Sequence, residues 1–206
     1  MTYQNKELNP VATLSDFIWK KDKVLSKDFC NKMIEKFDAD DRRYDGRIGT
    51  GQVVPLVKQT SDLKISGLDG WEDEDKVLFK SLKESMDEYY NHCTSIHPCL
   101  QVSGDAFDFN DTGYQIQRYE PEGYYEWHQD WTMDLDSARL YTYIWYLKTI
   151  KKGDDGYTQF IDGTKVRPKA GRIVVFPALW PYLHRAYPAK VRKYICTGWI
   201  YGKLKQ

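Results

Sequence analysis

The sequence is poor in the features that mark several common classes of protein. Its 206 residues include only four cysteines and four histidines, and 30 basic side chains balance 30 acidic ones. A net charge of zero gives no bulk indication of a nucleic-acid or membrane-surface partner. No apolar run approaches the ~20 residues that a membrane span needs, and the polar N-terminus lacks the apolar core of a signal peptide. We therefore expect a cytoplasmic protein.

The few cysteines show no CxxC spacing, and without a secretory signal they are expected to be reduced thiols. One short run, NHCTSIHPC, nevertheless holds four side chains of zinc-ligand type: His92, Cys93, His97 and Cys99. Their spacing matches no strong zinc template, and a histidine near a helix end is also favoured by the helix dipole. Metal binding by this cluster stays open at this point.

Aromatic residues, by contrast, are abundant. They make up 15% of the chain and include 16 tyrosines, which suits strands because aromatic side chains pack well on a pleated surface. From Tyr114 onward, short strand-like runs alternate with the turn-forming segments EPEG, KKGDDG and PKAG. Many short strands at this spacing predict an all-β sandwich, barrel or jelly roll.

Two segments before residue 114 have helical periodicity. In the first, from Leu25, Ser26 is expected to be the N-cap, and Phe29, Met33 and Phe37 recur on one face. The second covers residues 72–93 and begins with four acidic side chains, which the helix dipole favours there.

The remaining N-terminal segments are less regular. We expect a short strand at 17–20, a loop at 39–57 with a strand near its end, and turns throughout 104–113. The predicted whole is one domain, 1–206, mainly β with flanking helices. A helical N-terminal part, about 1–113, packs against a double-stranded β-helix (jelly roll) core, about 114–206.

The run YYEWHQDW places His128 two residues before Asp130. On a regular strand both side chains point to the same face and can supply two ligands to one metal ion. A third ligand can come from His92, His97 or His184, and a jelly roll can bring the strand YLHRAY, which carries His184, alongside. Two histidines and one carboxylate form the facial triad of non-haem Fe(II) oxygenases. The alternative interpretation is a solvated His–Asp contact on the surface.

The C-terminal half resembles the Fe(II)/2-oxoglutarate-dependent dioxygenases, in particular their prolyl 4-hydroxylase-like branch. RYEPEGYYEWHQD resembles the family's run from a tyrosine through a Pro/Gly turn into HxD, and DGYTQF resembles its GGETxF-type strand. RPKAGRIVVFPALWPYLH is similar to the turn and strand that lead to the distal histidine, and HRAYPAKVRKYICTGWIY to the closing strand. The N-terminal half fits more loosely, through VLSKDFCNKMIEKF and VKQTSDLKIS.

The resemblance implies that His128, Asp130 and His184 bind Fe(II). It also implies that Lys193 pairs with the C5 carboxylate of the co-substrate 2-oxoglutarate, with Arg192 as the alternative cation. On the last predicted strand Lys193 shares its face with Ile195, Thr197 and Trp199, which reads as a barrel interior and favours Lys193.

Further roles follow from the same resemblance. Thr197 is expected to donate a second hydrogen bond to the 2-oxoglutarate carboxylate. Tyr119 and Tyr146 match tyrosine positions that line the co-substrate pocket, although plain core aromatics are the alternative. Trp131 is expected beside the substrate entrance, whereas Trp127 is expected to pack away from the metal. Beyond the metal centre, no catalytic side chain is predicted.

The implied reaction uses Fe(II), 2-oxoglutarate and O₂ to hydroxylate an unactivated C–H bond, with release of succinate and CO₂. The resemblance favours a prolyl residue in a peptide or protein. A free amino acid or another small molecule is an alternative substrate, and a non-catalytic, cupin-like binding module is an alternative function. The loops at 39–57 and 104–113 are expected to frame the entrance and to decide the substrate. The sequence does not indicate an oligomeric state.

Overall fold

The computed structural model describes residues 12–49, 51–100, 107–133 and 137–204. Its helices are α1 (Lys27–Ala39) and α2 (Glu72–Ile96), with 3-10 turns η1 (Leu14–Phe17), η2 (Pro98–Leu100) and η3 (Trp180–Tyr182). Its strands are β1 (Trp19–Lys21), β2 (Tyr44–Asp45), β3 (Ser61–Lys64), β4 (Phe107–Asp111), β5 (Gln115–Tyr119), β6 (Tyr125–His128), β7 (Ser137–Tyr146), β8 (Thr158–Phe160), β9 (Lys165–Val166), β10 (Arg172–Pro177), β11 (His184–Ala186) and β12 (Lys193–Leu204).

Both predicted helices form. The Ser26 side chain accepts a hydrogen bond of 3.1 Å from the backbone N–H of Phe29, so one of the unpaired donors at the start of α1 is satisfied. The apolar stripe of α1 is buried at Cys30, Met33 and Phe37. In α2 the four acidic residues occupy the first turn, as the sequence predicts.

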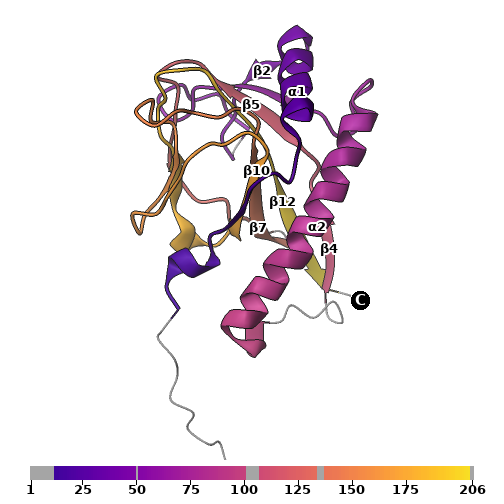
Figure 1. The fold of residues 1–206 in the computed structure, drawn as a ribbon, viewed down its shortest axis with the longest axis vertical. Coiled ribbons are helices and arrows are strands. Elements are labelled where there is room, and N and C mark those ends of the chain that lie inside the picture. Colours follow the sequence, from indigo (N-terminus) through magenta and orange to yellow (C-terminus); the bar gives the residue numbers. More distant parts are fainter. Residues whose placement is uncertain (1–11, 50, 101–106, 134–136, 205–206) are drawn as a thin grey trace, which may run out of the picture.

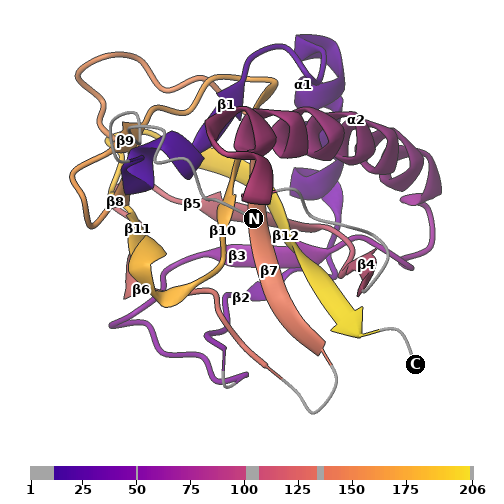
Figure 2. The same cartoon turned by 90° about the horizontal axis from the view of Figure 1, so that it is seen from below.

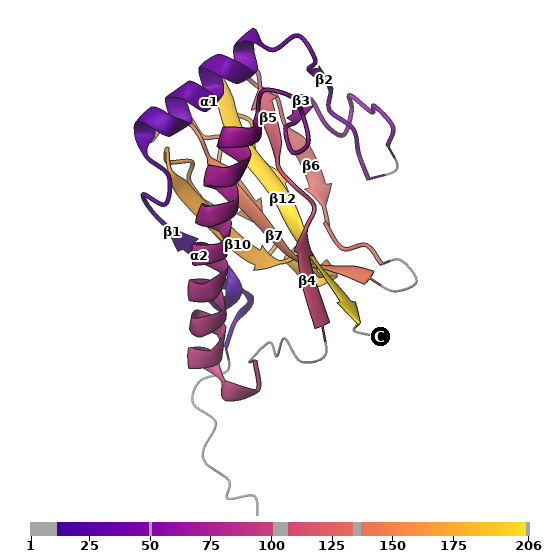
Figure 3. The ribbon, with the colours of Figure 1, turned by 90° about the vertical axis from the view of Figure 1, so that its right-hand side faces the viewer.

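The strands form two antiparallel sheets. The larger runs in the order β1-β10-β7-β12-β5-β3-β2, with β4 also paired to β12, and the smaller runs β6-β11-β8-β9. Both helices cover one face of the larger sheet (Figures 1 and 3). The strands of the smaller sheet lie away from the helices, on the other side (Figure 2). The predicted fold class, a jelly-roll core with helices packed against it, is confirmed.

Side-chain alternation along the central strands divides the buried residues into two clusters. On β7, Tyr143 and Trp145 pack with the helices, whereas Ile144 and Tyr146 belong to a second cluster between the two sheets. The same alternation continues on β10, since Val175 lies on the helix side and neighbouring residues on the inner side. Each central strand therefore supplies one face to the structural core and the other to the space between the sheets.

Two N-terminal segments differ from expectation. The strand expected near the end of 39–57 is a turn, in which the Val57 N–H donates to Val54 O, because Pro55 has no N–H for a sheet ladder and Leu56 is 84% exposed. The turn segment 104–113 instead contains β4, a polar strand that forms because β12 supplies its hydrogen bonds. Residues 104–106 lie outside the described residues.

The N-terminal part also contributes more strands to the larger sheet than the sequence predicts. Strands β1 to β4 all precede residue 114, and all join the larger sheet. Neither helix in the described part of the chain is both long and apolar enough to span a membrane. The cytoplasmic location stays a prediction from the sequence.

Candidate metal centre

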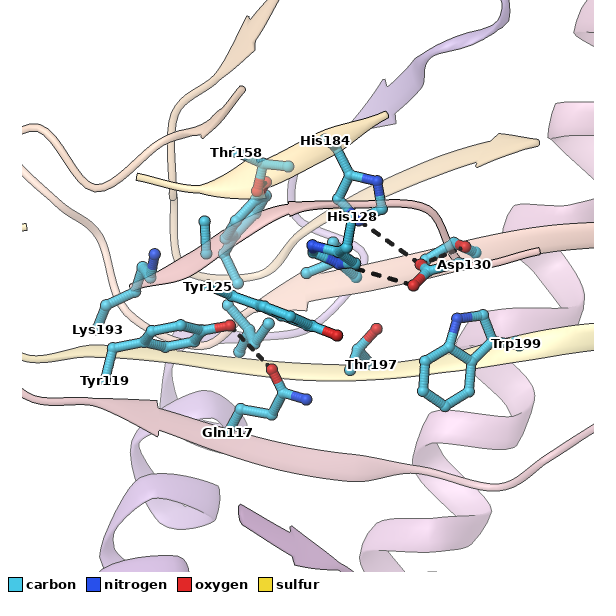
Figure 4. A pocket seen from close by; sticks show the side chains of 15 residues that line it. Gln117, Tyr119, Tyr125, His128, Asp130, Thr158, His184, Lys193, Thr197 and Trp199 are labelled. Atoms are coloured by element: carbon cyan, nitrogen blue, oxygen red, sulfur yellow. Dashed lines mark hydrogen bonds and ion pairs between the residues drawn. The ribbon is translucent and has the colours of Figure 1, made fainter. Parts of the chain in front are cut away.

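Three metal-ligating side chains meet at one end of the space between the sheets. Strands β6 and β11 pair so that His128 and His184 stand directly opposite one another, with ring centroids 4.3 Å apart. The Nε2 atoms of the two rings lie 3.7 and 3.6 Å from the carboxylate oxygens of Asp130. One ligand atom from each residue lies within 4.8 Å of the others, and Figure 4 shows the three side chains turned toward one another. This arrangement can hold a single ion.

The backbone fixes which nitrogen of each imidazole faces the site. The Nδ1 atom of His128 lies 2.7 Å from Glu126 O, and the Nδ1 atom of His184 lies 3.0 Å from Tyr182 O. A carbonyl oxygen only accepts hydrogen bonds, so Nδ1 carries the proton in both rings. The Nε2 lone pairs are then directed at the place where a metal would bind, as in known histidine-ligated centres.

Neighbouring side chains hold two of the ligands in place. The Thr142 hydroxyl donates to an Asp130 carboxylate oxygen at 2.8 Å, which orients the carboxylate. The Tyr125 ring stacks on the His128 imidazole, with centroids 3.6 Å apart and planes 11° apart. These contacts restrain the ligands before any ion binds, which favours a defined metal geometry.

The electrostatics of the site keep the ligands in their metal-binding forms. Burial lowers the pKa of His128, and the neighbouring His184 lowers it further, so the ring is neutral at physiological pH. Burial alone would raise the pKa of Asp130, but the two imidazoles and the Thr142 hydroxyl hold the pKa of that carboxyl below its ordinary value. A neutral imidazole and an ionised carboxylate are what a divalent cation requires.

Lys193 lies at the opposite end of the same pocket (Figure 4). Its side chain is 2% exposed, its ammonium donates to Tyr187 O at 3.3 Å, and it lies 4.1 Å from the centroid of the Tyr119 ring. Within the described part of the chain no carboxylate pairs with it. Burial therefore lowers the pKa of Lys193 to about 7. A buried cation without a counter-ion fits an anionic ligand, and the free carboxylate of 2-oxoglutarate is of that kind.

The other predicted co-substrate residues divide between the pocket and the surface. Tyr119, Tyr146 and Thr197 line the pocket. The Thr197 hydroxyl, however, donates to Tyr143 O at 2.7 Å on the adjacent strand, so its proton is not directed at a ligand as the sequence analysis expects. Arg192 lies outside the pocket, where its half-exposed side chain pairs with Glu120 at 2.9 Å. The structure thus brings Lys193, not Arg192, into the site.

The residues between and after the ligands depart from a regular strand. β6 ends at His128, so Asp130 reaches the site from beyond the strand. On a regular strand the alternation would turn Gln129 away from the ligand face, but Gln129 lines a wider cavity together with Asp130. Trp127 packs under the Arg185 guanidinium, 4.7 Å from its ring centroid, as a residue outside the site. Trp131 is 40% exposed just after Asp130 and does not line the pocket that holds the triad.

Several pocket residues are not among those predicted. Gln117, Tyr125, Thr142 and Thr158 line the pocket with the triad. Thr142 has a sequence signal, because it is a polar residue between apolar neighbours on the inward face of β7. Gln117 has none, because its strand, QIQRY, is mostly polar. Tyr125 and Thr158 have none, since their positions depend on how β6 and β8 meet β11 across the smaller sheet.

Among the side chains that the structure describes, His128, Asp130 and His184 are the one group of three placed to hold a metal ion. In the NHCTSIHPC run, His92 contacts Asp16 O at 2.6 Å and Cys93 is buried in the helix-side core. The side chain of Cys99 lies outside the described residues.

Comparison with known proteins agrees with the geometry. Residues 114–201 match the family model of the 2OG-Fe(II) oxygenase superfamily. A search of curated proteins gives no match. The identification from the sequence is therefore confirmed by a family model that covers the whole set of predicted ligands.

Solved structures of prolyl hydroxylases share the fold. The viral collagen prolyl hydroxylase of Paramecium bursaria Chlorella virus-1 is 24% identical, with a TM-score of 0.62 over 90% of this chain and 96% of that one. A Pseudomonas putida prolyl-4-hydroxylase is 20% identical, with a TM-score of 0.64 over 89% and 91%. A Trichoplax adhaerens prolyl hydroxylase is 16% identical, with a TM-score of 0.70 over 91% and 84%.

Residues 114–201 thus form a 2-oxoglutarate-dependent dioxygenase domain of the 2OG-Fe(II) oxygenase superfamily, and the chain as a whole has a prolyl hydroxylase-like fold. Enzymes of this class use Fe(II), 2-oxoglutarate and O₂, and the His128–Asp130–His184 group is its candidate iron site.

Proposed function

We propose that this enzyme hydroxylates an unactivated C–H bond of a prolyl residue in a peptide or protein, with release of succinate and CO₂. The observation that carries the proposal is one pocket with the metal triad at one end and the buried, unpaired Lys193 at the other. The structural neighbours support the substrate class, because they include a collagen prolyl hydroxylase and a prolyl hydroxylase in complex with a peptide fragment.

In this proposal the Nε2 atoms of His128 and His184 and a carboxylate oxygen of Asp130 hold Fe(II). Lys193 pairs with the C5 carboxylate of 2-oxoglutarate. When bound, the metal and co-substrate supply O₂ activation, in which one oxygen atom ends in succinate and the other in the substrate hydroxyl.

The protein orients these groups and keeps water away from them. Thr142 and the two backbone carbonyls hold the ligands, as their hydrogen bonds indicate. Buried Ile144, Tyr146 and Ile195 form apolar walls between the triad and Lys193. A dry pocket strengthens the pairing of Lys193 with a carboxylate, because the local dielectric is low.

We also infer that the helical part and the β-core act as one domain over residues 1–206. The support is that β1 to β4 from the first part share one sheet with β5, β7, β10 and β12 from the second.

The test is hydroxylation of a peptide panel. Proline-containing peptides and free proline are incubated with the enzyme, Fe(II), 2-oxoglutarate and O₂, and both succinate and the gain of one oxygen atom by the substrate are measured. We expect the two products in equal amounts with a peptide, and neither above background with Asp130→Ala. Succinate coupled only to free proline or to another small molecule would contradict the peptide assignment. Succinate at background throughout would contradict the activity itself.

A further inference from the structure

A second cavity opens beside the metal centre and shares four lining residues with the triad pocket, namely Gln117, Tyr125, Asp130 and Trp199. Its volume is about 290 Å³, and Lys193 does not line it. Because Asp130 faces both cavities, a molecule held here lies next to the metal without displacing the co-substrate. The volume is just below the range of roughly 300–1,000 Å³ that is usual for ligand sites, so it suits a short peptide segment better than a large ligand.

The lining of this cavity is rich in positive charge. Arg47, Lys58 and Arg139 all face it, whereas Asp130 is the one acidic residue among its lining residues in the described chain and is committed to the metal. Lys58 is already neutralised, because its ammonium lies 2.7 Å from Asp62 and both side chains are almost fully buried. The two arginines have no carboxylate partner among the residues that the structure describes.

Arg139, on β7, is held rigidly by neutral groups. Its Nε donates to the Tyr201 hydroxyl at 2.6 Å and its Nη1 to Asp130 O at 3.3 Å. Its guanidinium lies 4.0 Å from the centroid of the Trp199 ring. A hydroxyl, a carbonyl and an indole orient the guanidinium but leave its full charge at the cavity wall, a few atoms from a metal ligand.

Arg47 lies in the segment after β2, and the buried ion pair anchors that segment. The Lys58 ammonium donates to Arg47 O at 3.3 Å in addition to its contact with Asp62. The Arg47 guanidinium is 5.6 Å from the centroid of the Tyr44 ring, and both residues line the cavity. The backbone that carries Arg47 is therefore fixed by a buried group, while its charged end is exposed to a ligand.

We propose that this cavity recognises a carboxylate on the substrate, and that the carboxylate is the side chain of an acidic residue next to the target prolyl residue. The inference rests on the proposed function and adds to it the sequence around the target. A guanidinium binds a carboxylate through two parallel hydrogen bonds, so Arg47 and Arg139 favour a Glu or Asp neighbour over a neutral or basic one. The same charges speed the encounter with an acidic peptide.

The test uses three peptides that differ only in the residue beside the proline, which is Glu, Gln or Lys. The value of kcat/KM for hydroxylation is measured at saturating Fe(II) and 2-oxoglutarate. We expect the Glu peptide to exceed the Gln peptide by roughly tenfold or more, and the Lys peptide to be poorest. Arg47→Gln should reduce the preference for Glu, and Arg47→Glu should shift it toward Lys.

Two further variants keep this test selective. Lys152→Gln removes one positive charge from the exposed connection between β7 and β8, outside the cavity, and should leave the peptide preference unchanged. Arg139→Lys keeps the positive charge but removes the paired N–H donors of the guanidinium. It should therefore lower the preference for Glu without reversing it.

The outcomes distinguish a failure of the acidic-neighbour proposal from a failure of the proposed prolyl hydroxylation. Equal hydroxylation of all three peptides, or an unaltered preference in Arg47→Glu, overturns the acidic-neighbour proposal and leaves prolyl hydroxylation standing. Hydroxylation of free proline alone, or of none of these substrates, overturns both.

Discussion

The two faces of β12 show how one strand serves stability and chemistry separately. Tyr194 and Cys196 face α1 and α2 in the helix-side core, whereas Lys193 and Thr197 face the pocket. All four side chains are almost fully buried. On the helix side the Tyr194 hydroxyl donates to Asp38 at 2.7 Å. On the pocket side Lys193 is buried without a counter-ion.

The difference indicates where the molecule gives up stability for function. A buried charge without a partner opposes folding, so such a charge is typical of a site where function requires it. The triad is a further case, because two imidazoles and a carboxylate are kept close together in a buried site. Variants on the two faces should therefore have opposite effects on folding and on ligand binding.

The largest effect on stability is expected on the helix side. Phe37→Ala removes a fully buried ring that packs edge-on against Tyr194, with centroids 6.2 Å apart. The free energy of unfolding in urea should fall by about 3–5 kcal/mol, because a cavity is left in the core. The Kd of the folded protein for 2-oxoglutarate should stay unchanged, and a large rise in that Kd would contradict the separation of the two faces.

Lys193→Met should have the opposite pattern. Loss of the buried cation should weaken 2-oxoglutarate binding by about 2–5 kcal/mol, since a desolvated charge pair is lost, while Fe(II) affinity changes little. The free energy of unfolding without ligand should rise at pH 7 by on the order of 1 kcal/mol, because the cost of burying the charge disappears.

The matched control for Lys193→Met is Arg192→Met, which removes the neighbouring, half-exposed cation. It should leave 2-oxoglutarate binding unaltered when the affinity of both variants is measured by isothermal titration calorimetry. If Arg192→Met weakened binding and Lys193→Met did not, the assignment of the two cations would be reversed.

Thr142→Val tests the support of a metal ligand by its neighbour. The substitution keeps the shape of the side chain but removes the hydrogen bond to Asp130, so Fe(II) affinity should fall by about 10–100-fold. Thr158→Val is the same change in the same pocket at a hydroxyl that bonds to Tyr146 instead of a ligand, and it should leave Fe(II) affinity intact. Equal losses in both variants would show that Thr142 has no special role.

The smallest effect is a pH dependence of co-substrate binding. Burial places the pKa of Lys193 at about 7, and pairing with a carboxylate favours the charged form and raises that pKa. Below pH 7 the lysine is already protonated and binding is strongest. Above pH 7 binding must bring a proton to Lys193, so the Kd should rise about tenfold per pH unit until the pKa of the complex is reached. Lys193→Arg keeps its charge throughout and should remove this dependence.

Much of the fold and of the site can be predicted from local patterns. The N-cap Ser26, the two helices and the alternation that puts Lys193 in the pocket depend on periods of 3.6 and 2, which the sequence displays directly. The triad is also predictable, because the HxD pattern and a histidine on a later strand already contain all three of its side chains.

Features that depend on pairing between distant segments are not predictable in this way. The polar run of β4 becomes a strand only because β12 supplies its partners. Gln129 lies at the cavity because β6 ends at His128, so the alternation no longer applies at Asp130. The contacts of Arg47 and Arg139 join segments that are far apart in the sequence, and no spacing in the chain indicates that they share a cavity.

The most direct test of the metal site is an anaerobic titration of 2-oxoglutarate into the Fe(II)-loaded protein, followed by visible absorption. We expect the weak metal-to-ligand charge-transfer band in the wild type, its loss in His184→Ala, and its appearance only at higher 2-oxoglutarate concentrations in Lys193→Met. A wild-type protein without the band, or a His184→Ala variant that retains it at full intensity, would contradict the assignment of His128, Asp130 and His184 as the iron ligands.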